Sequence, residues 1–199
     1  MTAVNIVVLY YSKHGSTFAL AEAIARGAEQ VGANVKLRTV PPVSDNLDCS
    51  ASSIPNSGYP YISKHEIETC DGLALGSPTH FGNMAAPMKY FWDTTSDLWL
   101  KGSLVDKPAC VFSSSSSMHG GQESTLLSMM LPLFHHGMLL LGLPYSEPNL
   151  HDTKSGGTPY GVTSVVQNTQ HSTKLSDDEL SLAIAMGKRL ATTSKRQIG

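Results

Sequence analysis

A polar turn near the start of the sequence has the residue types of an anion site. Residues 12–17 contain three hydroxyl side chains around Gly15, between an apolar run at 4–10 and an apolar-periodic segment at 18–31. The apolar run indicates a buried strand, and the periodic segment indicates a helix. A helix start presents unpaired N–H groups that favour negative charge, and glycine allows close approach of the backbone. An ordinary helix N-cap has the same composition, so the turn alone does not decide between the two.

Two later loops resemble this turn in composition. The loop at residues 77–84 follows an apolar strand at 72–76, and the loop at 113–123 follows an apolar strand at 109–112. Both loops are polar, contain glycine and carry little charge. In a doubly wound sheet, ligands bind above the carboxyl ends of strands near the switch point. Three such loops on neighbouring strands therefore favour the ligand-site interpretation of residues 12–17.

The elements around these loops predict an α/β fold. Residues 35–40 alternate as a second strand, residues 138–143 form a fifth strand, and helical segments separate the strands. We expect a flavodoxin-like, doubly wound, five-stranded parallel sheet with strand order 2-1-3-4-5 and helices on both faces. The absence of linkers and repeats predicts one domain over residues 1–199.

Other segments give weaker expectations. Residues 41–62 indicate a long surface excursion, residues 65–69 a short helix or loop, and residues 98–106 a connection. A helix is expected over residues 124–134, where Pro132 predicts an early end or a kink. Residues 144–172 show no strand or helix pattern. Ser176 and Glu179 form a capping box at the start of the last helix, whose end at Lys195–Arg196 is expected to fray.

Composition indicates a cytoplasmic globular protein. Hydrophobic residues make up 41% of the chain, charged residues 15%, and the net charge is −2, so no binding of nucleic acid is expected. The three cysteines, Cys49, Cys70 and Cys110, are widely spaced and predict reduced structural thiols. No signal peptide or membrane insertion is expected. The eight histidines show no metal-ligand spacing, so no metal site is predicted.

The motif pattern narrows the ligand class. Residues 12–17 lack the Gly-x-Gly-x-x-Gly spacing of dinucleotide sites and the Gly-Lys-Ser/Thr ending of a P-loop. No Gly-x-Ser-x-Gly elbow is present, which disfavours a serine hydrolase. A terminal phosphate held by hydroxyls and helix N–H groups, with a flat ring over two further loops, suits FMN. Phe81 and Trp99 are candidate aromatic groups beside such a ring.

Five motifs, in order along nearly the whole chain, resemble one family. They are residues 12–17, residues 78–84, His119-Gly120-Gly121-Gln122-Glu123, residues 135–138 and residues 156–161. Together they are similar to the WrbA family of flavodoxin-like, FMN-dependent NAD(P)H:quinone oxidoreductases. The resemblance implies a homotetrameric enzyme that uses NADH or NADPH to reduce quinones to quinols by two-electron transfer.

The resemblance also implies site residues. The phosphate end of FMN would be held by Ser12, Lys13, His14, Gly15, Ser16 and Thr17, with His14 also near the nicotinamide. The flavin would be lined by Thr79, His80, Phe81, Ser114, Ser115, Ser116, Ser117, Met118, His119, Gly120 and His135. The quinone would stack on Trp99. His80 stands where relatives often carry Arg, which leaves the preference between NADH and NADPH open, and residues 113–117 are richer in serine than expected.

The chemistry falls mainly to the cofactor, because hydride transfer to flavin needs no protein acid or base. His135 is the candidate catalytic residue, since an imidazole at the flavin edge can stabilise negative charge and supply a proton to the quinone. The alternative is that His135 or His136 caps the end of the preceding helix, and we assign that structural role to His136. The alternative for Trp99 is a core or interface residue, and apart from the resemblance this structural role is the more usual one for tryptophan.

The alternative function is a flavodoxin-type electron carrier without turnover of its own. Such carriers are usually strongly acidic for docking on basic partners, and this chain is nearly neutral. The physiological quinone and the residues of the subunit interface do not follow from the sequence.

Overall fold

A parallel sheet forms the centre of the computed structural model, which describes residues 3–44, 55, 58–166 and 173–199. Its strands are β1 (Asn5–Tyr10), β2 (Asn34–Thr39), β3 (Gly72–His80), β5 (Pro108–Ser115), β6 (Leu139–Leu140) and β7 (Val162–Val165). The order β2-β1-β3-β5-β6 is the predicted doubly wound order. Every ladder between these strands is parallel.

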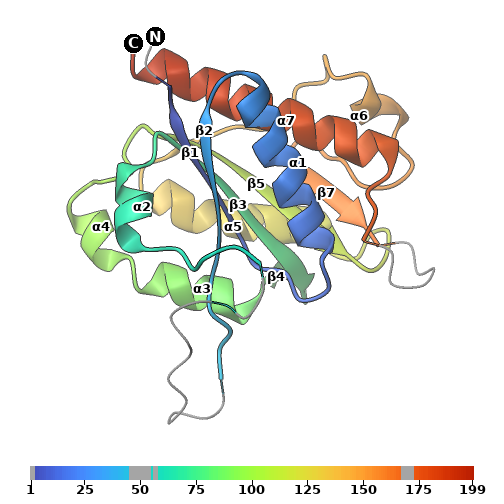
Figure 1. Cartoon of the computed structure of the whole chain (residues 1–199). Coiled ribbons are helices and arrows are strands. Elements are labelled where there is room, and N and C mark those ends of the chain that lie inside the picture. The colour runs from blue at the N-terminus through green and yellow to red at the C-terminus, as the bar shows by residue number, and fades with distance from the viewer. Residues whose placement is uncertain (1–2, 45–54, 56–57, 167–172) are drawn as a thin grey trace.

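Helices cover both faces of the sheet (Figure 1). On one face lie α1 (Ser16–Gln30) and α7 (Asp177–Gln197), and their apolar residues pack on β1. The other face is covered by α2 (Lys64–Thr69), α3 (Ala86–Asp93), α4 (Ser96–Leu100) and α5 (Gln122–His135). Gly27 and Gly187 allow α1 and α7 to pack closely, because a Cβ on either glycine would lie within 2.1 Å of a carbonyl oxygen of the other helix.

The fifth strand position is divided between two segments. β6 pairs with the start of β5 through Pro108 and Leu139, whereas β7 pairs with its end, from Phe112 to Ser115. The prediction of a continuous strand over 138–143 is therefore wrong, as is the expectation that 144–172 contains no strand or helix. After Leu141 the chain leaves β5, and the N–H of Leu143 bonds the carbonyl of Pro159 instead. The intervening segment carries α6 (Asn149–Asp152).

Two strands extend further than predicted. β3 continues through Ser77 and Pro78, which pair with Ser113 and Ser114 of β5. β4 (Asn83–Met84) then folds back antiparallel on the end of β3. The expected loops at 77–84 and 113–123 are correspondingly shorter, because their first residues hydrogen-bond within the sheet although their side chains are polar.

The helices also differ from the predictions in detail. The segment expected as a helix or loop is helix α2, and the expected connection at 98–106 contains part of α4. α5 runs past Pro132 to His135, because Met129 and Leu133 on its inner face are fully buried in the core. The predicted capping box of Ser176 and Glu179 is confirmed.

The last helix is regular to its end. α7 is helical through Lys195–Arg196 and ends at Gln197. Most of the 41–62 excursion and Cys49 lie outside the described residues. None of the helices within the described ranges is long and apolar enough to cross a membrane.

Candidate functional site

The start of α1 is open toward the carboxyl edge of the sheet. Its N-cap residue is Gly15, whose φ of 93° is readily adopted only by glycine. The Gly15 N–H donates to Ser12 Oγ at 3.1 Å. Among the described residues, no side chain caps this helix. The first-turn N–H groups therefore have no side-chain acceptor, which leaves the helix start open in the sense that favours anion binding.

A buried hydroxyl pair connects this turn to β5. Thr17 Oγ1 lies 2.8 Å from Ser114 Oγ, and the two side chains are 1% and 5% exposed. Thr17 is in the first turn of α1 and Ser114 is near the end of β5, so the bond joins the first and third polar loops.

A second set of hydroxyls connects β3, β5 and α5. Thr79 Oγ1 lies 3.2 Å from Ser113 Oγ and accepts a hydrogen bond from Thr125 Oγ1 at 3.2 Å. The backbones of the second and third loops also meet, since a Cβ on Gly121 would lie 3.2 Å from the Cα of Gly82. The structure therefore brings all three polar loops into one continuous rim.

The loop after β5 is held by one carbonyl. The carbonyl oxygen of Ser117 accepts from Ser115 Oγ at 2.7 Å, from Gln122 Nε2 at 3.1 Å and from the Gly120 N–H at 3.2 Å. α5 then begins at Gly121, again without a side-chain cap. The three donors give residues 115–122 a defined shape and leave a second helix start facing the rim.

The rim has exposed basic and apolar side chains at its border. Its loops at 12–17, 77–84 and 113–123 contain Lys13, His14, His80 and His119, and their one acidic residue is Glu123 in the first turn of α5. All four of these side chains are exposed, as are Ser116, Ser117 and Met118. Phe81 is fully exposed with φ 51°, a strained backbone conformation for a bulky residue. Such strain at the edge of a rim is typical of ligand-contacting positions.

Within one chain, His135 and Trp99 lie apart from these three loops. α5 starts at the rim and runs back along the sheet, so that Gly137, two residues after His135, accepts a hydrogen bond from the N–H of Asp106 just before β5. α4 is at the same end, because Thr95 at its start is bonded to His136. The end of α5 and helix α4, which carry His135 and Trp99, thus lie away from the three polar loops (Figure 1).

His136 is buried, but its side chain bonds Thr95 at the start of α4 rather than the terminal carbonyls of α5, which is the capping role predicted for it. It is 8% exposed, its Nε2 lies 3.0 Å from Thr95 Oγ1, and its ring packs on the edge of Trp92. Burial, and to a lesser extent the charge of His135, lowers the pKa of His136. A neutral, buried imidazole fixes the end of α5.

Several residues near the rim were not identified from the sequence. Thr173 precedes α7 and lies against the first loop, since a Cβ on Gly15 would lie 2.7 Å from its methyl carbon. Thr125 was assigned only to a helix. Threonines at such positions carry no motif, and only the tertiary fold brings them to the rim.

Thiol and metal chemistry have no basis in the described part of the chain. Cys70 and Cys110 are buried, and burial raises the pKa of Cys70 to about 11 and that of Cys110 to about 12. Both thiols are therefore protonated at neutral pH. No group of histidine, cysteine and acidic side chains that could hold a metal ion occurs among the described residues.

The sheet order and the open helix start at the carboxyl edge define a flavodoxin-like protein. The fold agrees with a WrbA-like flavodoxin from Agrobacterium tumefaciens, which has a TM-score of 0.69 and 24% identity over 98% of this chain and 99% of that one. The model of the NADPH-dependent FMN reductase family matches residues 4–146.

Relatives cover nearly the whole chain. A protein of Geotalea daltonii named NAD(P)H dehydrogenase (quinone) is 40% identical over 98% of each chain. A protein of Solidesulfovibrio magneticus with the same name is 38% identical over 96% of this chain and 98% of its own. The chain belongs to the NADPH-dependent FMN reductase family, and the family resemblance drawn from its motifs is confirmed.

Proposed function

We propose that this chain is an FMN-dependent NAD(P)H:quinone oxidoreductase that reduces quinones to quinols by two-electron transfer. The observation that carries the proposal is the row of hydroxyl pairs, Thr17 with Ser114 and Thr79 with Ser113, beneath an open helix start. The relatives at about 40% identity bear the corresponding enzyme name, which supports the same activity here. The unit that carries it is one flavodoxin-like domain over residues 1–199, acting in the cytoplasm.

The residues of the rim fit FMN. The backbone N–H groups at the start of α1, with Ser12, Ser16 and Thr17, would hold the phosphate. The flavin ring would lie against Thr79–Phe81 and residues 114–120. When bound, FMN supplies hydride acceptance from the nicotinamide and donation to the quinone. The protein's part is to hold the ring, to place His14 beside the nicotinamide cofactor and to leave one ring face accessible.

We further infer that the active form is a homotetramer. On α5, Leu127, Leu131 and Phe134 are 47%, 61% and 59% exposed, and their spacing places them on one helix face. Apolar side chains in such a stripe favour contact with another copy. His135 and Trp99 lie at this end of the molecule, away from the rim of their own chain. A neighbouring copy would therefore supply both to the flavin and the quinone.

The test is to purify the protein, record its visible spectrum after saturation with FMN, and follow oxidation of NADH and of NADPH with benzoquinone. Bound flavin and quinone-dependent turnover are expected. A protein that takes up no FMN would overturn the proposal. The same assay measures the ratio of rates with NADH and NADPH, which His80 leaves open.

The electron-carrier alternative is disfavoured by charge and by the relatives. A net charge of −2 gives little of the acidic surface that a dedicated carrier uses for docking. The two functions differ in one measurement. A carrier would bind FMN but would not oxidise NADH or NADPH when benzoquinone is the only acceptor.

A further inference from the structure

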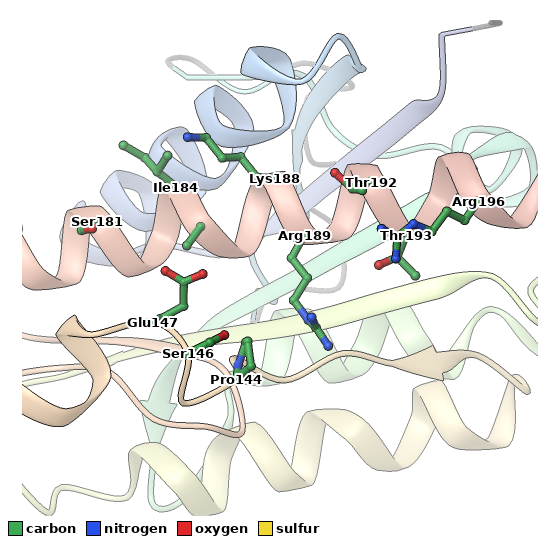
Figure 2. A pocket seen from close by; sticks show the side chains of 11 residues that line it. Pro144, Ser146, Glu147, Ser181, Ile184, Lys188, Arg189, Thr192, Thr193 and Arg196 are labelled. Carbon is green, nitrogen blue, oxygen red and sulfur yellow. The ribbon is translucent and has the colours of Figure 1, made fainter.

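A concave site lies on the flank of the molecule, away from the rim. It is a pocket of about 550 Å³ between α7 and the segment at residues 144–147 that follows β6 (Figure 2). None of the residues assigned to the flavin, the nicotinamide or the quinone lines it. Its volume is in the range of small-molecule sites.

Two arginines form the wall on the α7 side. Arg189 and Arg196 are two helical turns apart, and Thr192 and Thr193 lie between them, so the four side chains share one stripe of the helix. Figure 2 shows the Arg189 side chain reaching from α7 toward Pro144. Both arginines are exposed, and neither makes an ion pair or side-chain hydrogen bond with any described residue.

This arrangement is more specific than a solvated helix surface. Arg196 near the end of α7 is favoured by the helix dipole, but Arg189 is in the middle of the helix, where the dipole has little effect. In a chain with 14 basic residues in all, Lys188, Arg189 and Arg196 line this one pocket, against a single carboxylate, Glu147. The pocket therefore carries a net positive charge that no described side chain neutralises.

We propose that this pocket binds a small organic phosphate. The guanidinium groups of Arg189 and Arg196 match phosphate oxygens in geometry and charge, and the Thr192 and Thr193 hydroxyls add neutral donors. Glu147 on the opposite wall accepts hydrogen bonds from hydroxyl groups of the ligand's organic part. A phosphorylated sugar has both features, which distinguishes it from inorganic phosphate.

The test is calorimetric titration of the FMN-saturated protein with ribose 5-phosphate and with inorganic phosphate. We expect ribose 5-phosphate to bind more tightly than phosphate. Arg189→Ala should weaken both by about tenfold or more, the usual effect of losing a charge-assisted contact. Arg189→Lys should fall between, because lysine lacks the fork. Glu147→Ala should remove the advantage of ribose 5-phosphate without weakening phosphate.

Arg26→Ala is the matched control, since Arg26 is an exposed arginine on α1 that does not line this pocket. It should bind both probes like the wild type, and turnover with NADH and benzoquinone should be unchanged in Arg189→Ala. Equal binding of both probes by wild type and Arg189→Ala, or no binding at millimolar concentration, overturns the proposal. Failure of the protein to bind FMN would count against the proposed enzyme activity alone, because the comparison of Arg189→Ala with Arg26→Ala isolates this pocket.

Discussion

At the residue scale, hydrogen bonds between single hydroxyl groups join the loops of the rim. Thr17 and Ser114 come from positions 97 residues apart in sequence and share a buried hydrogen bond. Removing one partner leaves the other buried and unsatisfied, which costs about 1–3 kcal/mol. The same removal changes the shape of the phosphate end of the site. Removal of either hydroxyl should therefore lower both the free energy of unfolding and the affinity for the cofactor.

Thr17→Val tests this pair with an isosteric change. We expect the free energy of unfolding to fall by about 1 kcal/mol and the affinity for FMN to fall by about tenfold. Urea unfolding of the apoprotein and fluorescence titration with FMN measure the two effects. Thr158→Val is the control, because Thr158 is also buried and hydrogen-bonded but lies in the segment before β7. If both variants bind FMN like the wild type, Thr17 does not shape the phosphate site.

The buried His136 should make stability depend on pH. Thr95 Oγ1 donates to the carbonyl of Trp92, so His136 Nε2 must donate to Thr95, and the neutral ring leaves Nδ1 bare. Nδ1 is buried without a partner among the described residues, and protonation would place an unsatisfied N–H there. Burial accordingly lowers the pKa of His136 below 6.5.

The sign of the effect is set by proton binding. Below pH 6.5 the unfolded chain binds a proton at His136 before the folded chain does, so stability falls as the pH is lowered from about 6.5 to the depressed pKa. Urea unfolding at several pH values between about 5 and about 7.5 measures the slope. His136→Asn should reduce that slope relative to the wild type, and an unchanged slope would assign it to other histidines.

At the scale of elements, apolar patterns in the sequence predicted the main strands and helices, whereas features imposed by tertiary contacts were missed. The five strand positions, α1 and the α7 capping box are indicated by apolar runs and by Ser176 with Glu179. Ser113–Ser115 were assigned to a loop, since three serines have no strand propensity, but pairing with β3 and β7 makes them strand. The divided fifth strand was missed because a two-residue pairing leaves no periodic signal.

Glu179 ties three elements together and should be important for stability. One of its carboxylate oxygens accepts from the N–H groups of Gly156 and Val165, and the other from Ser164 Oγ and the N–H of Ser176. The residue is 1% exposed. Glu179→Ala would remove the acceptor of three backbone N–H groups, of which that of Gly156 is buried and those of Val165 and Ser176 are partly buried, so we expect a loss of about 2–4 kcal/mol. Glu29→Ala on the exposed side of α1 should change stability little; equal losses would contradict the assignment.

For the candidate site, the sequence predicted where the three loops lie along the chain but did not predict the contacts that join them. The glycines and hydroxyls of residues 12–17 and 113–121 carry a recognisable pattern, whereas Thr125 and Thr173 approach the rim only through packing. The distance of His135 from the rim depends on the direction of α5. A motif match does not specify the direction of α5. It assigns a residue to a site without specifying whether that residue comes from the same chain or from a neighbouring copy.

At the scale of the whole molecule, the apolar stripe on α5 should control assembly. Leu131→Asp places a charge in the centre of the exposed apolar face. We expect light scattering to show a tetramer for the wild type and a smaller species for this variant, with quinone turnover reduced and FMN retained. Val43→Asp, at another exposed apolar position, is the control. A monomeric wild type with full turnover would contradict the tetramer.

The divided fifth strand affects which insertions and deletions the chain can tolerate during evolution. β6 and β7 bond different parts of β5, so the register of each half is fixed by its own hydrogen bonds. Residues between them can be gained or lost without shifting either ladder. That segment also forms one wall of the pocket beside α7. The sheet edge is therefore a place where descendants of this protein can acquire new recognition surfaces while the rim that holds the cofactor stays intact.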